Sequence, residues 1–390
     1  MNPEEVIKEL SNLASKDLND ANVKKEALKL SKRLTATLED PLIRAIELAF
    51  APLFPAAARI AVDLDLFTRI NTHDGPITSA QLASASGGEE LLIHRILRVL
   101  AAVGFVHEVS NDKWTGNAST KAIASGPITA AHRFVWDIQI ASIVKAPKFL
   151  RENKHVCPTE PRDGFIQYAH QSKLNFFELL GTMPSLLKDF NNFMGHTLGE
   201  RQYWIDWYPI PSRLIRGFDP ATPMLVDIGG GRGHDLQAFH DKFPESWKLF
   251  LQDLPQALKG IKEGELDPSI KIMEHDFFTE QPVKGARAYF LHHIFHNWAD
   301  MYCLVILKHL RTAMTPGYSK LLIHELILPD SNATVIHGIL DMVMMNINGG
   351  MERSRAQWTK LLEEAGFQVV EFMVPEDEDA DGIVEAMVMV

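Results

Sequence analysis

The sequence predicts an α/β protein with a mixed sheet, preceded by a mostly helical N-terminal region. From residue 222 onward, short apolar runs alternate with helix-like segments, which is typical of parallel strands joined by helical crossovers. The predicted parallel strands cover residues 224–229, 248–252, 270–274, 286–291 and 320–327. Two further apolar runs, 368–374 and 383–390, are separated only by the polar turn 375–382, so they must pair antiparallel. The sequence therefore predicts a parallel sheet that ends in an antiparallel hairpin.

Length and composition limit the kinds of protein that this chain can be. With 390 residues, 46% hydrophobic and 23% charged, it has the composition of a globular protein and the length of two domains. The net charge of −11 disfavours binding to nucleic acid or to an anionic membrane. The two cysteines, Cys157 and Cys303, are far apart, which disfavours disulfides and a zinc site and favours a reducing compartment. The start of the chain is polar, and the apolar stretch 49–62 holds two prolines and an arginine and is too short to span a bilayer, so we expect a cytoplasmic protein.

The N-terminal region is predicted to be a helical module with a small hairpin. Residues 1–48 have apolar positions at helical spacing. The next predicted elements are helices at 57–70, 77–85 and 89–103, followed by short strands at 105–109 and 113–115. This order is typical of winged-helix domains. Glu89 and Glu90 open the third helix and would repel nucleic-acid phosphates, so the sequence favours a scaffold or dimerisation module over a DNA-binding one.

Residues 126–215 are again mostly helical and contain a stretch rich in Phe and Met at 176–194. Such side chains are usually plain core, but they also line pockets for flat apolar ligands. His132 and Trp136 lie one helical turn apart and share one face of the predicted helix. A histidine in this setting is more often a packing residue than a catalyst, so both interpretations stay open.

The segment MLVDIGGGRG, residues 224–233, predicts a ligand site at the end of the first strand. An apolar run that includes Asp227 leads directly into a glycine turn, and a helix is predicted at 235–243. A strand, a glycine turn and a helix bring backbone N–H groups and the positive end of the helix dipole to one place. A Cβ there would hold a ligand away from the backbone. The spacing is GxGxG, because the GxGxxG of dinucleotide enzymes would need a glycine where His234 stands. The glycines of the pattern are Gly229, Gly231 and Gly233.

Acidic residues at the ends of the next two strands indicate the kind of ligand. Asp253, followed by Leu254, ends the second strand and is placed to accept hydrogen bonds from a ribose diol. Asp276, followed by Phe277, ends the third strand, where a carboxylate beside an aromatic ring suits an adenine. No GKS or GKT follows the glycine turn, so a pyrophosphate clamp is not predicted. This combination fits S-adenosylmethionine better than NAD or ATP.

A histidine-rich segment, LHHIFHNW, follows the fourth strand at the sheet edge where ligands bind in open α/β folds. Each of His292, His293 and His296 is suited to remove a proton from a phenol or enol near neutral pH. Glu325 ends the next strand and Glu352 follows a Met-rich helix; a carboxylate bonded to one imidazole nitrogen would fix the tautomer. A surface cluster of histidines is the commoner explanation for such a segment alone. The sequence contains no compact carboxylate cluster that requires a metal ion.

The motifs LVDIGGGRG, QDLP, HDFF, HHIFHNW, HELILP and NGGMER resemble, in type, order and spacing, those of the class I S-adenosylmethionine-dependent O-methyltransferases of the plant caffeic acid type and their fungal relatives. The resemblance covers nearly the whole chain. It implies a Rossmann-like methyltransferase domain, a winged-helix-like dimerisation domain, a homodimer, and a small aromatic or polyketide-type substrate. The implied division is 1–125 for dimerisation, 126–215 for the substrate pocket, and 216–390 for the cofactor and catalysis.

The resemblance also implies roles for individual residues. His296 would be the general base, with Glu325 and Glu352 as its flanking carboxylates and no metal ion. We expect S-adenosylmethionine to be held by Asp227, Gly229, Gly231, Gly233, Asp253, Leu254, Asp276, Phe277 and His292. We expect the methyl acceptor to be bordered by His132, Trp136, Phe190, Met194, His293, Asn297 and Met345. Two departures from the family pattern are His292, where plant members carry a lysine, and Asn297, where aspartate is commoner.

Two other functions are compatible with the sequence. Some fungal proteins that resemble this family use the bound sulfonium as a fixed charge for pericyclic or dehydration chemistry, without methyl transfer. In such a protein His132, Arg133, His292 or His296 would polarise a carbonyl group. Because the chain keeps the histidine base and both carboxylates, we favour methyl transfer to a hydroxyl. A winged-helix regulator with a vestigial ligand domain is disfavoured by the acidic third helix.

Overall fold

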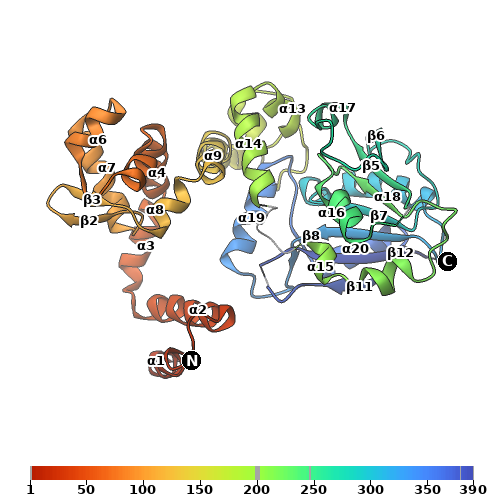
Figure 1. The fold of residues 1–390 in the computed structure, drawn as a ribbon, viewed down its shortest axis with the longest axis horizontal. Coiled ribbons are helices and arrows are strands. Elements are labelled where there is room, and N and C mark those ends of the chain that lie inside the picture. Colours follow the sequence, from red (N-terminus) through yellow and green to blue (C-terminus); the bar gives the residue numbers. More distant parts are fainter. Residues whose placement is uncertain (1, 198–202, 246, 378, 390) are drawn as a thin grey trace. The chain divides into compact units, whose positions relative to one another are not determined.

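The computed structural model describes residues 2–197, 203–245, 247–377 and 379–389, and it consists of two compact units (Figure 1). The first unit is Met1–His132 and the second is Arg133–Val390. The second unit therefore includes most of the region 126–215 that we expected to form a substrate-pocket segment of its own. Its role in binding substrate stays a prediction.

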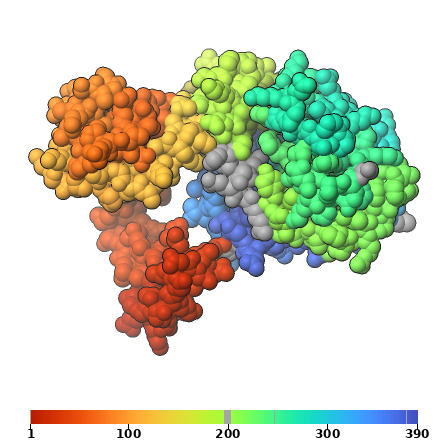
Figure 2. All heavy atoms as spheres, viewed as in Figure 1, coloured from red at the N-terminus to blue at the C-terminus, as the bar shows by residue number. Residues whose placement is uncertain are grey.

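The first unit opens with three helices, α1 (Pro3–Ala14), α2 (Ala21–Leu38) and α3 (Pro41–Phe50). Each begins at a polar cap, because Asn2, Asp20 and Asp40 accept backbone N–H bonds from the first turn. In the space-filling view these residues, coloured red, lie at the surface (Figure 2). The exposed apolar side chains of α3 and of the start of α4 (Leu53–Asp63) are Leu42, Ile43, Ile46, Leu48, Phe50, Leu53 and Phe54.

The stretch Pro41–Asp63, which contains α3 and α4, is long and apolar enough to cross a membrane by length and composition alone. Its mean hydropathy is 1.5 over an 18-residue window, and 17% of that window is buried. The apolar stretch 49–62, which is too short by itself, is thus part of a longer helical stretch of 23 residues. An exposed apolar surface of this kind fits another protein chain as well as a bilayer.

The rest of the first unit has the predicted winged-helix arrangement. Its elements after α4 are α5 (Leu66–Thr72), β1 (Ile77–Thr78), α6 (Ser79–Ser86), α7 (Glu90–Ala102), β2 (His107–Ser110), β3 (Lys113–Thr115) and α8 (Ala118–Ile123). The strands pair antiparallel in the order β1-β3-β2, and Trp114 of β3 is fully buried in the core of this unit. The prediction of a single helix at 57–70 was wrong, because two helices, α4 and α5, cover this stretch. Asp65 has a left-handed backbone, with φ of 53°, which separates α4 from α5.

Helices fill the chain between the two predicted domains. They are α9 (Gly126–Phe134), the π-helix η1 (Val135–Ile140), α10 (Ala141–Ile143), α11 (Ala146–Glu152), α12 (Phe165–His170), α13 (Phe176–Gly181), α14 (Pro184–Thr197), α15 (Trp204–Trp207) and the π-helix η2 (Pro211–Ile215). In the second unit, Phe134, Phe176 and Leu180 pack with Met344 and Ile347, which lie on and after helix α19 (Val335–Asn346). These helices are therefore joined by an apolar core to the segment that precedes Glu352.

The second unit is built on a seven-stranded sheet (Figure 1). Its elements, apart from α19, are β4 (Leu225–Ile228), α16 (His234–Lys242), β5 (Leu249–Asp253), α17 (Pro255–Leu258), β6 (Ile270–Glu274), β7 (Ala288–His292), the 3₁₀ turn η3 (Phe295–Asn297), α18 (Asp300–Ala313), β8 (Lys320–Glu325), β9 (Ile327–Leu328), β10 (Arg353–Ser354), α20 (Arg355–Glu364), β11 (Phe367–Met373) and β12 (Gly382–Val388). The strand order is β11-β12-β8-β7-β4-β5-β6. The strands from β8 to β6 are parallel, and β12 is antiparallel to both β8 and β11. The predicted parallel sheet with an antiparallel hairpin is confirmed.

Both faces of the sheet are buried at the central strands β4, β7 and β8, which explains the mostly apolar runs there. Val226 and Tyr289 belong to a core with residues of α18 and α20. Leu225 and Phe290 belong to a second core with residues of α15 and α16. Adjacent strand residues point to opposite faces, so each run supplies both cores and leaves its carboxyl end free to carry polar residues.

Candidate active site

The glycine turn after β4 has a backbone that glycine adopts most easily. The φ angles of Gly229, Gly231 and Gly233 are +72°, +58° and +80°. Space imposes a second requirement, because a Cβ at Gly229 would lie 2.4 Å from Ile294 Cδ1, and one at Gly230 would lie 2.3 Å from Asp227 Oδ2. A Cβ at Gly231 would meet no described atom within 4 Å. Gly231 therefore borders open space, while its neighbours are packed against the protein.

Asp227 on β4 carries a buried carboxylate that fits a cationic ligand. Its side chain is 1% exposed, and neither oxygen has a hydrogen-bond partner among the described residues. Burial, followed by the neighbouring Asp235, raises its pKa well above the usual range. An ammonium group beside it would satisfy these oxygens and favour the ionised carboxylate. The α-ammonium group of S-adenosylmethionine has this chemistry, so the residues of the turn fit that cofactor.

The carboxylate at the end of β5 is held against the glycine turn. Asp253 Oδ2 accepts the N–H of Gly231 at 2.8 Å, and its Oδ1 accepts the N–H of Leu254 at 2.6 Å. Burial raises the pKa of Asp253 even though both N–H groups act in the opposite direction. Each carboxylate oxygen can accept a second hydrogen bond, so the group remains suited to a ribose diol.

The end of β6 brings an aromatic ring to the same place. Asp276 Oδ1 accepts the N–H of Phe278 at 3.0 Å, which closes a short turn after the strand. A Cβ built on Gly229 would lie 3.8 Å from Phe277 Cε1, so the Phe277 ring is next to the glycine turn. Because β4, β5 and β6 are neighbouring parallel strands, their carboxyl ends meet at one edge. The structure thus brings the expected cofactor residues together.

His292, the last residue of β7, lies at the carboxyl edge of the sheet. Its Nδ1 lies 2.7 Å from Asp235 Oδ2, at the start of α16. Burial disfavours a charged imidazole, but Asp235 outweighs it and raises the pKa of His292. The rings of His324 and His293 lie 4.1 Å and 4.3 Å from the His292 ring. Sequence reasoning assigned no role to Asp235 or to His324, although His324 opens the motif HELILP.

His296 and Glu352 form a buried pair at the carboxyl edge of the sheet. His296 lies in η3, and its Nδ1 is 2.9 Å from Glu352 Oε1. Burial opposes the charged imidazole, but Glu352, with help from Glu325, raises the pKa of His296 to about 9. Because Nδ1 is held by the carboxylate, Nε2 is the nitrogen that can take a proton from a bound hydroxyl.

Glu325 contacts His296 through the backbone and not through the imidazole. Its Oε1 accepts the N–H of His296 at 3.2 Å, and burial raises the pKa of Glu325 to about 7. The two-residue strands β9 and β10 pair Arg353 with Ile327 directly after these carboxylates. This ladder brings Glu325 and Glu352 together beside His296. Two-residue strands have no periodic pattern, so sequence analysis did not predict the ladder.

Arg353 is a residue of the site that sequence reasoning missed. It is 1% exposed, and its Nε and Nη2 lie 2.9 Å and 2.8 Å from Asp300 Oδ1. The same guanidinium donates to the carbonyl oxygens of Phe295 at 3.2 Å and Trp298 at 2.8 Å. These residues flank His296 in the chain, so Arg353 fixes the loop that presents the imidazole.

The glycines of NGGMER have a steric role beside the same loop. The His296 carbonyl oxygen accepts the N–H of Met351 at 2.9 Å. A Cβ on Gly350 would lie 2.1 Å from that carbonyl oxygen. The N–H of Glu352 donates to Asp341 Oδ1 at 2.9 Å, which fixes the other end of the segment. The close approach of these two segments of the chain brings Glu352 within reach of the His296 imidazole.

Three of the expected acceptor residues lie among the helices of the second unit. Phe190 packs against Phe134 and Phe176, with ring centroids 5.2 Å and 5.9 Å apart, so part of the aromatic stripe is plain core. Trp136 is partly exposed on the π-helix η1, a distortion that is frequent at functional sites. Met194 is partly exposed on α14. Their contact with a substrate stays a prediction.

Two other expected acceptor residues belong to the histidine loop. His293 Nε2 lies 3.1 Å from Asp381 Oδ2, and its ring stacks on His296 with centroids 5.0 Å apart. Asn297 Nδ2 donates to the His293 carbonyl oxygen at 2.8 Å. The structure thus gives Asn297 a role in shaping the loop.

The last two expected acceptor residues lie in different units. Met345 is partly exposed on α19, with its Sδ 3.8 Å from Cys157 Sγ. His132 is half-buried at the end of the first unit, where burial, followed by Arg59, lowers its pKa. A neutral imidazole is expected there near pH 7.

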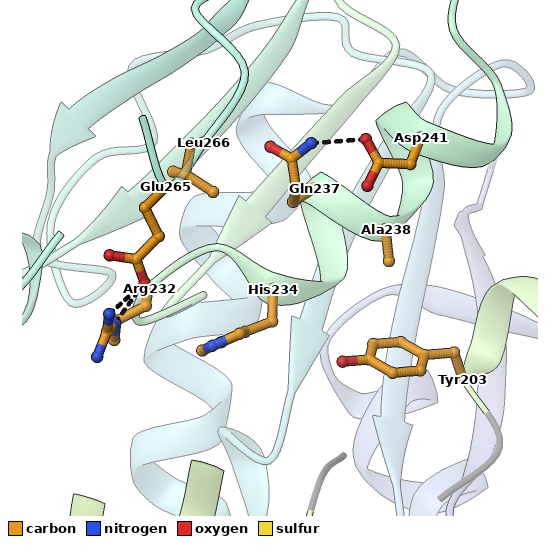
Figure 3. A pocket seen from close by; sticks show the side chains of 8 residues that line it. All are labelled: Tyr203, Arg232, His234, Gln237, Ala238, Asp241, Glu265 and Leu266. Atoms are coloured by element: carbon orange, nitrogen blue, oxygen red, sulfur yellow. Dashed lines mark hydrogen bonds and ion pairs between the residues drawn. The ribbon is translucent and has the colours of Figure 1, made fainter. Parts of the chain in front are cut away.

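A hollow of about 240 Å³ lies against α16 (Figure 3). Figure 3 shows Arg232 bonded to Glu265 at one end of it and Tyr203 at the other, with His234 between them. None of the expected catalytic residues is among the described residues that line it. The hollow is therefore separate from the pair formed by His296 and Glu352.

The fold and the site define a class I methyltransferase, with a glycine turn, two acidic strand ends and a buried histidine–carboxylate pair at one sheet edge. Comparison with known proteins identifies the family. The family model of the O-methyltransferase domain matches residues 206–368, and that of the O-methyltransferase dimerisation domain matches residues 46–124. The chain belongs to this family and is an S-adenosylmethionine-dependent O-methyltransferase.

Individual relatives agree with this assignment. O-methyltransferase penC of Penicillium thymicola is 48% identical over 373 residues, which are 95% of this chain and 93% of that protein. The crystal structure of OxaC in complex with SAH and oxaline is similar with a TM-score of 0.84 at 25% identity, covering 99% of each chain. A structure described as a pericyclic reaction enzyme is similar with a TM-score of 0.85 at 26% identity, covering 99% of each chain.

Proposed function

We propose that this enzyme methylates a phenol or enol hydroxyl of a small aromatic or polyketide-type secondary metabolite, with His296 as the general base and without a metal ion. The observation that carries the proposal is the buried contact of 2.9 Å between His296 Nδ1 and Glu352 Oε1. It directs Nε2 of the imidazole to the acceptor and stabilises the imidazolium that forms. The relative OxaC, whose structure contains SAH and oxaline, supports a small-molecule acceptor.

The pKa of His296 suits this reaction. A value of about 9 is close to the ordinary pKa of a phenol, about 10, so the proton transfer is nearly balanced in free energy. A cation bound beside the imidazole lowers that value toward neutral pH, where the unprotonated base is better populated. When bound, S-adenosylmethionine supplies an electrophilic methyl group and a neutral thioether as leaving group. The proton of the acceptor hydroxyl stays on His296 Nε2 until it is released to solvent.

The two carboxylates have different tasks in this proposal. Glu352 fixes the tautomer of His296 and compensates the charge of the imidazolium. Glu325 bonds the backbone N–H of the same residue and prevents the loop from moving. Asp227, Asp253 and the glycine turn hold the cofactor so that its reactive group and the base meet one acceptor oxygen. Positioning of this kind supplies much of the acceleration of a displacement reaction.

The proposed assembly is a homodimer. The exposed apolar side chains of α3 and of the start of α4 overlap the residues matched by the dimerisation model. Burial of that surface against a second copy explains why a stretch with a mean hydropathy of 1.5 is exposed in one chain. A cytoplasmic location is proposed with it, since the second copy removes the apolar surface from water.

The alternative is a pericyclase or dehydratase that binds S-adenosylmethionine without consuming it. The structural likeness to a pericyclic reaction enzyme favours this alternative. Two observations disfavour it. Arg133, a candidate for polarising a carbonyl, forms a bidentate pair with Asp189 at 2.8 Å and 2.6 Å. The base and its carboxylate are also intact, and fixed-charge catalysis does not need them.

The test uses S-adenosylmethionine labelled in the methyl group. The full-length enzyme is incubated with the cofactor and with a panel of fungal phenols and polyketides, and label in the products is followed by mass spectrometry. We expect label to enter a hydroxyl group and to be lost in His296→Ala, with cofactor affinity kept within about threefold.

Two results would contradict the proposal in different ways. A His296→Ala variant with most of the wild-type rate would exclude His296 as the base. A product of unchanged mass, formed only when unconsumed cofactor is bound, would support the pericyclase alternative instead.

A further inference from the structure

Three polar side chains lie at the ends of neighbouring strands, on a face of the sheet that is otherwise apolar. The register pairs His292 of β7 with His324 of β8, and His324 with Ile383 of β12. Paired residues point to the same face, so both imidazoles lie on the face that Ile383 and Phe290 share with α15 and α16. Asp381 stands two residues before Ile383 and lies with the two imidazoles, at the same strand ends.

The three side chains have the geometry of a ligand set. One ligand atom from each of His292, His324 and Asp381 lies within 4.8 Å of the other two. Two ligand atoms of a tetrahedral zinc ion are roughly 3.4 Å apart for bonds of about 2.05 Å, so small side-chain rotations are sufficient. His292 Nε2 and His324 Nδ1 are buried and have no hydrogen-bond partner among the described residues. His324 is 5% exposed, so water does not readily supply the partner that its Nδ1 lacks.

Two of these candidate ligands are held by a second side chain. His292 Nδ1 is 2.7 Å from Asp235 Oδ2, which leaves Nε2 as the unprotonated nitrogen of the neutral ring. Asp381 Oδ2 is 3.1 Å from His293 Nε2. Histidines that bind metals usually donate their other N–H to a carboxylate, and carboxylate ligands are themselves hydrogen-bonded. Both supporting contacts follow this rule.

We propose that His292, His324 and Asp381 bind a divalent transition-metal ion of the zinc class. Two imidazoles and one carboxylate are a common donor set for Zn²⁺, and a water molecule can complete the tetrahedron. The ion links the ends of β7 and β8 to the residue that precedes β12, and it satisfies two buried nitrogens. Its role is structural, at strand ends that border the expected cofactor site.

A second group with similar distances does not support a metal proposal. His296, Glu325 and Glu352 also offer ligand atoms within 4.8 Å of one another. In that group, however, the imidazole N–H and the backbone N–H already bond the two carboxylates. It is the base assembly described above.

The test is metal binding by the full-length protein, without an affinity tag and after removal of metals by chelation. Co²⁺ is added as a spectroscopic probe, and Zn²⁺ affinity is measured by calorimetry. We expect one Co²⁺ per chain, with visible bands typical of four- or five-coordinate Co²⁺, displaced by one equivalent of Zn²⁺.

Variants separate this site from other metal-binding residues. His324→Gln and Asp381→Asn are expected to weaken Zn²⁺ binding at least 100-fold. Asp235→Asn, which removes a supporting contact, is expected to weaken it about 10- to 100-fold. His107→Gln, at an exposed residue of β2, and Cys157→Ser are matched controls and should bind as the wild type does.

The outcomes decide the proposal even if a variant is unstable. Circular dichroism and the melting temperature show which variants fold, and Asp381→Glu, which keeps a ligating oxygen, should retain binding if Asp381→Asn loses it. Wild-type protein that binds no stoichiometric Co²⁺ or Zn²⁺ would overturn the proposal. Folded His324→Gln and Asp381→Asn variants with wild-type affinity would overturn it too.

Discussion

Replacing Gly350 with alanine tests whether the base is positioned by the close approach of two chain segments. The added Cβ would lie 2.1 Å from the His296 carbonyl oxygen, whereas such contacts in proteins are essentially never shorter than 3.0 Å. The two segments must therefore separate by about 0.9 Å. The backbone of Gly350 does not have a positive φ, so the effect of the substitution is one of space and not of backbone strain.

The expected loss follows from that displacement. A misplacement of about 1 Å at a catalytic group costs on the order of 100-fold in rate. We expect Gly350→Ala to reduce kcat by about that factor, with the affinity for S-adenosylmethionine nearly unchanged because the glycine turn is on other strands. Overpacking typically also destabilises a protein by about 1–3 kcal/mol, so the melting temperature should fall by a few degrees.

The assay compares Gly350→Ala with Gly338→Ala. A Cβ on Gly338, in helix α19, would meet no described atom within 4 Å, so this control adds the same methyl group without a clash. Steady-state kinetics, calorimetric cofactor binding and thermal melting are measured for both. A folded Gly350→Ala enzyme with wild-type kcat would refute the positioning argument. Equal losses in both variants would show that the effect is not specific to the His296 loop.

Three further predictions concern the pH profile, the cofactor site and the assembly. Because the base must be unprotonated, kcat/KM should rise with pH until His296 has lost its proton. Glu352→Gln removes the charge that raises the pKa of His296, so this rise should move to lower pH, while kcat falls about 10²- to 10⁴-fold. A pH profile that does not shift would argue against the pairing of His296 with Glu352. Gly230→Ala places a Cβ 2.3 Å from Asp227 Oδ2 and should raise the Kd for S-adenosylmethionine about 10- to 100-fold, as measured by calorimetry. A wild-type Kd would count against the assignment of this turn to the cofactor. Leu48→Lys, at a side chain that is 76% exposed, should convert a dimer to a monomer in light scattering, and a wild-type mass would exclude this surface as the interface.

Local pattern was sufficient to predict the architecture. The parallel strands were predicted because a strand buried on both faces is mostly apolar, and all of β4 and all but the last residue of β7 are buried. The antiparallel hairpin of β11 and β12 followed from a connection too short for a crossover. The break between α4 and α5 at Asp65, where the backbone is left-handed, was not predicted.

The candidate site was predictable where chemistry resides in a motif. Glycines after a strand, acids at the ends of the next two strands, and His296 after the fourth were all identifiable, because parallel strands bring their carboxyl ends to one edge. Residues that act through distant contacts were not. Arg353 reaches three positions around His296, and Asp381 meets His293, across separations in the chain that no local pattern records.

The sequence by itself determined the kind of sheet, the kind of cofactor and the identity of the candidate base, since each depends on residue type and on order along the chain. Only the tertiary structure decided which partner each side chain has. It showed that Glu352 bonds the imidazole while Glu325 bonds the backbone, and that His324 lies beside His292. The physical reason is that strand register and the β9–β10 ladder set these distances, and both arise from packing of the whole unit and not from any local run of residues.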